Sequence, residues 1–307
     1  MTRTSTATAF DRAIQSMASQ QTRLYQLQSQ ISTGQKASRP AEDPVAAAQA
    51  ESVKGEITRI DVERRMVGFA RTVLQQADTA LGTGTDLINT ARDLVLQANN
   101  STMTAADRAS IASQIRGLRN ELLSVANTRD GSGAFVFGGQ GSRTAPFVET
   151  AGMVGYVADA GSQQVGQDTR VSTSLDGHAT FMSIPDGAGG RHSVFDVLDA
   201  AVAALSNPAA TTADINAAAQ AALEGLDGGL ASTSLARSNV GEQLRMIDQV
   251  EGSLDTSELD AQTRLSAIVD VDYAAAISEF AKVQTGLQAA MQTYAQLSSN
   301  SLFNYLR

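Results

Sequence analysis

An apolar residue recurs at every seventh position between residues 53 and 95. Residues 45–145 and 209–307 contain no proline, so each stretch can form long, uninterrupted helices. The repeat predicts one coiled-coil-like helix over residues 44–99, about 84 Å long at 1.5 Å per residue. The side chains of a second row beside the repeat become small along the helix, which would let a partner helix approach closely. The repeat consists of Val53, Ile60, Val67, Leu74, Leu81, Ile88 and Val95, and the second row of Ile57, Ala70, Ala77, Gly84, Ala91 and Ala98.

Further helices are predicted on both sides of this one. Apolar spacings of three, four and seven indicate helices at residues 10–31, 105–128 and 271–302. Two more helical patterns begin at Val194 and near Thr212. Each of the two terminal helices has an apolar stripe that needs a partner to bury it.

Local signals mark two of the helix starts. Asp43 followed by Pro44 predicts an N-cap with proline at the first helical position. Thr104 and Asp107 resemble a capping box, with Asp in place of the usual Glu. In the helix after Thr212, three glycines are expected to weaken the helical structure locally, namely Gly225, Gly228 and Gly229.

The middle of the chain differs in composition from both ends. Residues 131–190 hold 13 of the 25 glycines, which indicates turns and short strands. Ala134–Phe137 is predicted to form a strand. Further short β segments are expected at residues 147–149, 156–157 and 179–184.

Together these patterns predict a mainly α fold. The N- and C-terminal regions are expected to form a long antiparallel coiled coil or helical rod, with a small β-rich insert in the middle of the chain. Residues 1–43 and 265–307 would form a terminal coiled-coil layer. Residues 44–135 and 193–264 would form the helical rod, and residues 136–192 the outer insert.

Composition excludes several classes of function. With 23 basic and 32 acidic side chains the net charge is −9, which argues against a nucleic-acid binder. The chain has no cysteine, so thiolate nucleophiles and Cys-ligated metal sites are excluded. Its two histidines, His178 and His192, lie near Gly-rich turns and are expected on the surface. No apolar run approaches the length of a membrane span, and the N-terminus lacks the apolar region of a Sec signal.

No motif predicts an enzyme, a cofactor or a metal site. The Gly82–Gly84 segment lies inside the heptad stretch rather than after a strand, so a dinucleotide loop is not expected. The Gly138–Gly141 segment lacks the lysine and the helix of a phosphate loop. Asp270 and Asp272 are interpreted as a helix start rather than a metal pair.

The two terminal helices carry few charges. Residues 1–31 contain four charged side chains and residues 273–306 contain two, and the remaining polar positions are mostly Gln, Ser and Thr. An amide-rich face costs little to desolvate against another protein, so we expect these helices to be buried inside an assembly. A weakly ordered Ser/Gln-rich tail is the alternative. The expected interface residues are Ile14, Met17, Leu24, Leu27, Ile31, Tyr273, Ile277, Phe280, Leu287, Met291, Tyr294 and Leu297.

Both ends of the chain resemble one known family. The segment QISTGQKASRPAEDPVAAAQ (residues 30–49) resembles the N-terminal signature of the flagellar hook-associated protein 3 family, which is related to flagellin. The segments DYAAAISEFAKVQT (272–285) and QLSSNSLFNYL (296–306) are similar to the family's C-terminal end. The resemblance covers about 130 N-terminal and 90 C-terminal residues, but not the Gly-rich middle. Two mild departures, at residues 35–36 and 41–43, leave the prolines of the turn in place.

The resemblance implies a structural role. The termini would form an inner coiled-coil layer, the neighbouring helices an outer layer, and the insert would project outward. Copies of the chain would form a ring that joins hook-associated protein 1 to the flagellin filament. The chain would leave the cell through the flagellar type III exporter, with a chaperone on its C-terminal helix. A flagellin-type filament subunit is the nearest alternative, and a secreted coiled-coil effector or adhesin with a ligand-binding insert is the alternative from another class.

Overall fold

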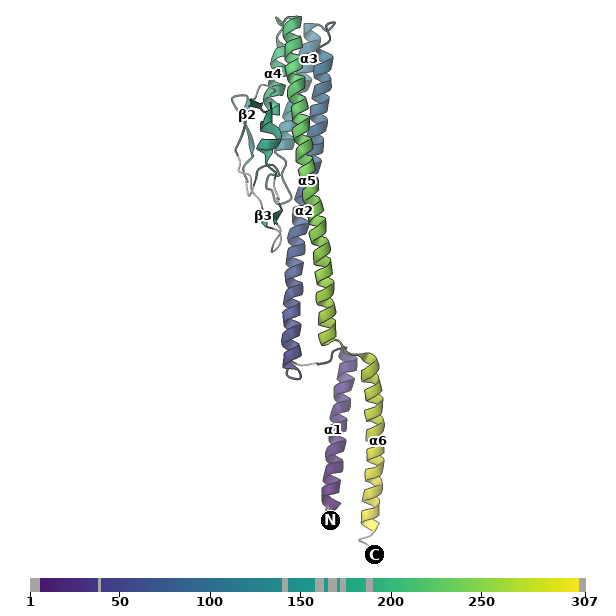
Figure 1. The fold of residues 1–307 in the computed structure, drawn as a ribbon. Helices are drawn as coiled ribbons and strands as arrows, with labels where there is room; N and C mark the ends of the chain where they lie inside the picture. The colour runs from purple at the N-terminus through teal and green to yellow at the C-terminus, as the bar shows by residue number, and fades with distance from the viewer. Residues whose placement is uncertain are drawn as a thin grey trace. The chain divides into compact units, whose positions relative to one another are not determined.

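The chain is mainly helical, as the sequence predicts, with a small β-containing insert (Figure 1). It divides into two compact units, residues 1–60 with 255–307 and residues 61–254. The computed structural model describes residues 6–37, 40–139, 143–157, 163–164, 170–171, 175–185 and 190–303. The α-helices are α1 (Thr6–Thr33), α2 (Pro44–Ala98), α3 (Ala105–Ala126), α4 (Val194–Ser206), α5 (Thr212–Val269) and α6 (Tyr273–Phe303).

The heptad repeat lies on one side of α2, and every one of its seven apolar members is buried. Helix α5 has a matching repeat, which is hard to recognise from the sequence because two of its members are Thr and Ala. A shared spacing of seven is the pattern expected for helices that pack along a continuous seam. The α5 repeat consists of Leu226, Thr233, Val240, Ile247, Leu254 and Ala261, all of them buried.

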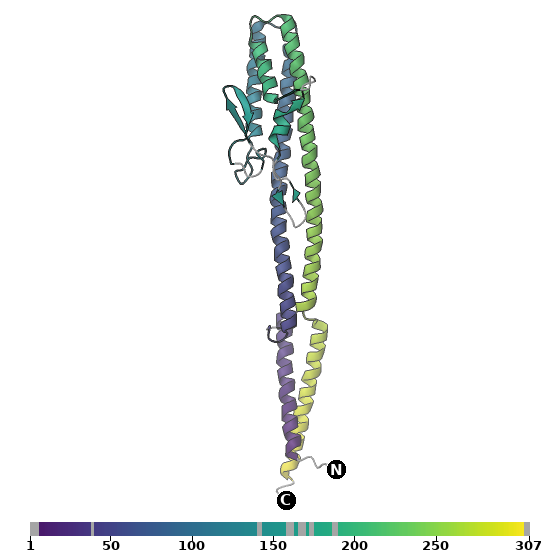
Figure 2. The same cartoon turned by 60° about the vertical axis from the view of Figure 1, so that its left-hand side comes forward.

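Ion pairs show that α2 and α5 run antiparallel in the unit of residues 61–254. Arg71 on α2 contacts Glu251 on α5 at 2.7 Å. Further along α2, Arg92 contacts Asp227 at 2.8 Å, so the partner number falls as the α2 number rises. The two helices lie side by side in Figures 1 and 2.

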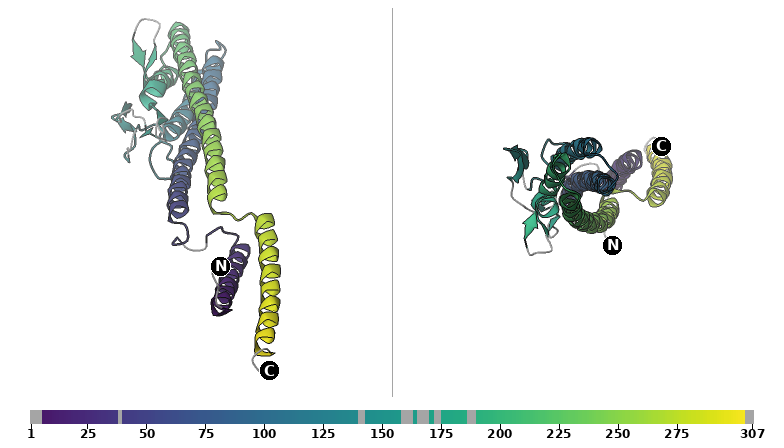
Figure 3. Two further views of the ribbon diagram at one scale, coloured as in Figure 1. Left: turned by 60° about the horizontal axis from the view of Figure 1, so that its bottom comes forward. Right: turned by 90° about the horizontal axis from the view of Figure 1, so that it is seen from above.

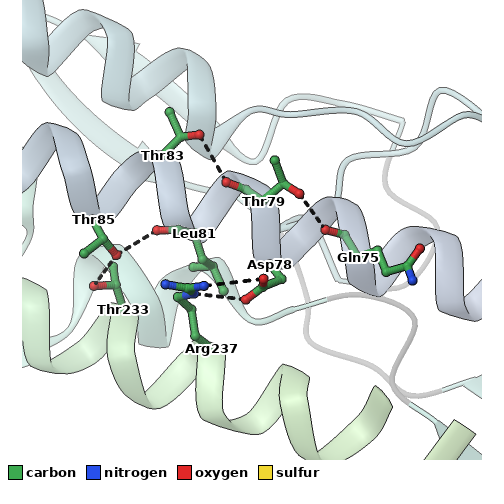
Figure 4. Close-up of polar contacts among 8 residues, drawn as sticks. All are labelled: Gln75, Asp78, Thr79, Leu81, Thr83, Thr85, Thr233 and Arg237. Carbon is green, nitrogen blue, oxygen red and sulfur yellow. Dashed lines mark hydrogen bonds and ion pairs between the residues drawn. The ribbon is translucent and has the colours of Figure 1, made fainter. Parts of the chain in front are cut away.

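Polar contacts also mark the register of this pair (Figure 4). Arg237 Nε donates to Asp78 Oδ1 at 2.9 Å, and this hydrogen bond raises the pKa of the Arg237 guanidinium. Thr233 occupies a buried seam position, and its hydroxyl donates to a carbonyl one turn earlier in α5 at 3.0 Å. The hydroxyl of Thr85 donates to the Leu81 carbonyl at 2.8 Å and lies 3.5 Å from the Thr233 hydroxyl. A polar seam position of this kind favours one register over its neighbours.

Both predicted helix starts are confirmed. The Ala46 amide donates to Asp43 Oδ1 at 2.9 Å, so Asp43 caps α2. At the start of α3, the Thr104 side chain accepts from the Asp107 amide, and the Asp107 carboxylate accepts from the Thr104 amide. These local bonds satisfy amides that a helix N-terminus leaves free.

Close packing against α5 explains the presence of glycine at positions 225, 228 and 229. The helix runs through all three of them without a break. A Cβ on Gly228 would lie 2.5 Å from Ile184 Cγ2, and a Cβ on Gly225 would lie 2.6 Å from Val197 Cγ2. These positions therefore let the insert and α4 approach the backbone of α5 closely.

The described part of the insert contains three two-stranded antiparallel sheets. In the first, Phe147 pairs with Tyr156 and Thr150 pairs with Met153, so a two-residue turn joins the strands. Figure 3 shows the insert on one side of the α2 and α5 helices. The strands are β1 (Phe147–Thr150), β2 (Met153–Tyr156), β3 (Gln163–Gln164), β4 (Arg170–Val171), β5 (Ile184–Pro185) and β6 (Arg191–His192).

Two predictions for the insert are wrong. Ala134–Phe137 is not a strand but makes only an isolated bridge, between Phe135 and Arg129. Consecutive residues 135–137 are all buried, so the segment lacks the alternating exposure of a surface strand. Most of the predicted segment 179–184 belongs to a π-helical turn, His178–Met182, which leads into β5.

An aromatic cluster forms the core of the insert. The rings of Phe137 and Phe181 meet edge to face, with centroids 5.4 Å apart. Phe147 lies between this pair and α4, at 5.7 Å from Phe181 and 5.9 Å from Phe195. Burial of these large side chains against each other stabilises the short strands, which could not persist alone.

A buried arginine joins the insert to the helices. Arg119 on α3 is only 3% exposed, and it contacts Asp199 on α4 at 3.0 Å and Glu149 on β1 at 3.1 Å. Burial lowers the pKa of Arg119, but its hydrogen bonds to the two carboxylates outweigh this effect and hold the pKa above the ordinary value. Arg119 therefore links α3, α4 and β1 through ion pairs.

Candidate assembly surface

The two terminal helices α1 and α6 pair with each other in the unit of residues 1–60 and 255–307 (Figures 1 and 2). Near the chain ends, the rings of Phe10 and Tyr294 meet edge to face with centroids 5.5 Å apart. At the opposite end of the pair, Gly34 lies close to Tyr273. The early part of α1 therefore faces the late part of α6, which confirms the predicted antiparallel pairing.

The pairing leaves a groove between the two helices. It has a volume of about 400 Å³ and is lined mainly by apolar side chains. Five of the twelve expected interface residues meet here, together with two positions that were not expected. The expected residues are Ile14, Met17, Leu287, Met291 and Tyr294, and the additional ones are Ala18 and Gln21.

The apolar side chains of this surface are only partly covered within one chain. Ile14 is 48% exposed, Met291 is 49% exposed and Ile277 is 54% exposed. Tyr273 is 51% exposed, whereas Leu27 is 3% exposed and belongs to the interior of the helix pair. The other expected residues with described side chains are half-buried, namely Met17, Leu24, Ile31, Phe280, Leu287 and Tyr294, and the side chain of Leu297 lies outside the described part of the chain.

Few charges surround the groove. In the described part of α1 the charged residues are Asp11, Arg12 and Arg23, and in that of α6 they are Glu279 and Lys282. Glu279 and Lys282 contact each other at 3.7 Å on the same helix. The exposed polar positions are mostly amides and hydroxyls, so a protein that covers this surface would desolvate few charges.

Sequence reasoning missed several residues of this region. Ala18 and Gln21 line the groove without a strong apolar signal, because they lie beside the stripe rather than on it. The short segment Gly34–Lys36 contacts the connection between α5 and α6 through its backbone. Backbone pairing between segments so distant in sequence leaves no pattern in side-chain types, although glycine after a helix is a known stop signal.

The structure favours no catalytic or metal site among the residues it describes. No group of three His, Asp or Glu side chains there has metal-binding geometry. Gly82 and Gly84 lie inside α2. Asp272 caps α6 by accepting from the Ala275 amide at 3.1 Å, which confirms its interpretation as a helix start. Both histidines are exposed, as expected; Gly138 bridges to Asp176, and residues 140–142 lie outside the described part.

None of the helices in the described ranges is long and apolar enough to cross a lipid bilayer. Gln, Ser and Thr occur along most of the length of α1 and α6.

Two family models match the chain, one at each end. Residues 4–142 match the bacterial flagellin N-terminal helical region, and residues 223–306 match the bacterial flagellin C-terminal helical region. The unmatched stretch between them contains most of the insert. The two matched regions contain all twelve of the expected interface residues.

Curated relatives match nearly the whole length. Flagellar hook-associated protein 3 of Escherichia coli (strain K12) is 33% identical over 289 residues, covering 89% of this chain and 90% of the relative. Flagellar hook-associated protein 3 of Salmonella typhimurium is 29% identical over 320 residues, covering 99% of this chain and 100% of the relative. A crystal structure of the flagellar junction protein FlgL from Legionella pneumophila shares the fold, with a TM-score of 0.61 and 18% identity over 73% of this chain and 100% of that chain.

Proposed function

This chain belongs to the flagellar hook-associated protein 3 family of flagellin-like proteins, and from that membership we propose that it forms the ring that joins the hook to the filament. It is a structural protein of the bacterial flagellum. Its proposed neighbours are hook-associated protein 1 on one side, flagellin on the other, and copies of itself within the ring. In this role the chain presents helical surfaces that bind both neighbours.

The observation that carries this proposal is the surface formed by α1 and α6. Four of its large apolar side chains are about half exposed in the single chain, and few charges surround them. Complete burial of such a side chain contributes about 1.5–3 kcal/mol, so covering four half-exposed ones would contribute on the order of 3–6 kcal/mol per subunit. Repeated around a ring, this contribution favours assembly over the free chain.

Residues 1–43 and 265–307 would then form the inner layer of the ring. Residues 44–135 and 193–264 would form the surrounding helical layer, and residues 136–192 would face outward. In this arrangement the exposed interface residues of α1 and α6 contact the terminal helices of neighbouring copies, whereas Leu27 stays inside the helix pair. The short insert strands would contribute little to assembly.

We further propose that the chain reaches the flagellum through the flagellar type III apparatus. The exposed apolar residues of α6 are an aggregation hazard until assembly covers them. A flagellar export chaperone that holds α6 would cover these residues until the chain enters the export apparatus. The apparatus would then place the mature subunit outside the cell.

A flagellin-type filament subunit remains the second candidate, because both family models describe flagellin regions. Electron microscopy of a deletion strain separates the two functions. A junction protein predicts hooks without filaments and flagellin released into the medium. A filament subunit predicts hooks without filaments and no other filament protein in the medium.

Complementation of the deletion strain adds a control within the chain. The full chain should restore filaments, and a chain with part of residues 140–190 replaced should do so largely. A chain that lacks residues 273–307 should leave bare hooks. If the truncated chain restores filaments, the terminal helices are not the assembly surface.

A further inference from the structure

The hairpin formed by β1 and β2 packs against the rest of its unit by one face only. On this face Phe147 and Val154 are buried, and Tyr156 is half-buried. On the opposite face Met153 is 67% exposed and Val148 is 43% exposed. The hairpin therefore covers part of the aromatic cluster while burying few of its own side chains.

Phe147 is the side chain of the hairpin that enters the cluster most deeply. Its ring contacts the rings of Phe181 and Phe195. A Cβ on Gly177 would lie 2.7 Å from Phe147 Cζ and 2.8 Å from the Phe137 carbonyl oxygen, so the ring lies against a backbone that carries no side chain. Withdrawal of Phe147 would expose the remaining rings of the cluster to water.

Two side chains from the C-terminal half of α3 bind the edge of β1 that faces away from β2. The Asn127 side-chain amide donates to the Phe147 carbonyl at 2.9 Å, and the Phe147 amide donates to Asn127 Oδ1 at 3.1 Å. This is the pair of bonds that a neighbouring strand would exchange with Phe147. Two residues further along β1, Glu149 contacts Arg119 at 3.1 Å. Helix α3 therefore holds β1 at two points.

The hairpin has little stability of its own. Its strands are four residues long, and a two-stranded hairpin of this size is marginal in water. The turn residues Ala151 and Gly152 both have positive φ, +53° and +83°, as a type I′ turn requires. An alanine in this left-handed region is strained. The hairpin therefore keeps its shape only while it is docked, so docking and strand pairing are lost together.

We propose that the β1–β2 hairpin is a lid over the aromatic cluster that opens as one unit while the α2–α5 pair stays folded, and that Asn127 and Arg119 hold it closed. Opening uncovers Phe181 and Phe195, which are both 0% exposed under the closed lid. An element with few buried contacts opens at a lower free energy than the whole unit. The lid is complete within one chain, and its opening does not depend on the proposed function.

Labelling of single thiols with iodoacetamide at increasing urea tests the lid, because the chain has no cysteine of its own. Val154→Cys introduces a thiol under the lid, and Val240→Cys introduces one in the α2–α5 seam, at positions that are 4% and 0% exposed. The residue 154 thiol should react faster, and its rate should rise only weakly with urea because lid opening exposes little surface. The residue 240 thiol should show the steep urea dependence of global unfolding. Equal rates with equal urea dependence would overturn the lid.

A substitution in the seam separates lid opening from global unfolding. Val67 is 1% exposed in α2, and Val67→Ala should speed labelling of the residue 240 thiol about tenfold through the lost burial. The residue 154 thiol should keep its rate, because the seam contact is lost equally with the lid closed and with the lid open. Acceleration of both thiols by the same factor would show that residue 154 is exposed only by global unfolding, and would contradict the proposal.

Variants at the two holding points test what keeps the lid closed. Asn127→Ala should speed labelling of the residue 154 thiol about thirtyfold, the factor that two lost hydrogen bonds of ordinary strength give. Glu149→Gln, which removes the charge that Arg119 binds, should speed it about fivefold. The control variants Ser124→Ala and Glu121→Gln, at exposed positions of α3, should leave the rate unchanged. Unchanged labelling in Asn127→Ala and Glu149→Gln would show that α3 does not hold the lid, and would contradict the proposal.

Discussion

Single residues in this chain have roles that depend on how closely backbones approach one another. The α5 glycines show this best, because Gly225, Gly228 and Gly229 lie against side chains of α4 and the insert, whereas Gly241 and Gly252 have nothing within 4 Å of an added Cβ. Leu287 shows the same dependence on surroundings, since it lines a groove that one chain alone does not fill. A prediction for a single residue therefore needs a control substitution at a matched position on the same helix.

Gly228 and Gly241 form such a matched pair. Gly228→Ala should lower the free energy of unfolding by about 1–3 kcal/mol, because the new Cβ would overlap Ile184. A Cβ added at Gly241 would have no atom within 4 Å. Gly241→Ala should therefore raise the free energy of unfolding by about 0.5–1 kcal/mol through helix propensity. Urea unfolding followed by circular dichroism measures both. Equal effects at the two positions would contradict close packing at Gly228.

Leu287→Asp should abolish incorporation into the flagellum and leave the isolated chain folded. The reason is that a carboxylate in the α1–α6 groove would have to be desolvated without a partner when a neighbouring copy covers it. Circular dichroism should show helical content close to that of the wild type, while motility is lost. Gln284→Asp, an exposed position one turn earlier, is the control and should remain motile. Normal motility of the Leu287 variant would contradict burial of the groove.

At the scale of elements, the long helices were predictable and the insert only in part, since the predicted strand at residues 147–149 is confirmed as β1. The heptad repeat and the Asp43–Pro44 signal placed α2 within one residue of its observed ends, because both signals are local. The segments 134–137 and 179–184 were mistaken for strands because their shape is set by a shared aromatic core. The backbone pairing of residues 34–36 with residues 269–271 was not predictable either, because it joins residues more than two hundred positions apart.

Capping boxes at the starts of α3 and α5 predict a pH dependence. Hydrogen bonds from the Thr104 hydroxyl and backbone amide lower the pKa of Asp107, and Thr211 lowers the pKa of Asp214 in the same way. A lowered pKa means that the folded state binds fewer protons than the unfolded state, so the stabilisation is complete above the ordinary value of 3.8. It is lost as the pH falls through the lowered pKa.

The expected result is a fall in the free energy of unfolding between about pH 5 and pH 2 that is smaller in Asp107→Asn than in the wild type. Asp260→Asn, at an exposed position inside α5, provides the comparison and should leave the slope unchanged. Denaturant unfolding at several pH values measures this. If Asp107→Asn leaves the slope of the free energy of unfolding against pH unchanged, this capping box contributes nothing to the acid response.

In the whole molecule, stability and assembly depend on different regions of the chain. The α2–α5 seam, the aromatic cluster and Arg119 are complete within one chain, so they hold the subunit together without a neighbour. The apolar faces of α1 and α6 are half exposed in the single chain, and in the proposed ring other copies cover them. A chain of this design is expected to be stable alone and functional only in the assembled flagellum.

Side-chain accessibility of α6 in the free and the assembled subunit tests this claim most directly. Met291→Cys introduces a single thiol at a half-exposed position of the groove, and Met153→Cys introduces one on the exposed hairpin of the insert. Maleimide should label both thiols in the free chain. After assembly into flagella, the residue 291 thiol should be protected and the residue 153 thiol should still react. Equal labelling of residue 291 in the free and the assembled subunit would contradict the account.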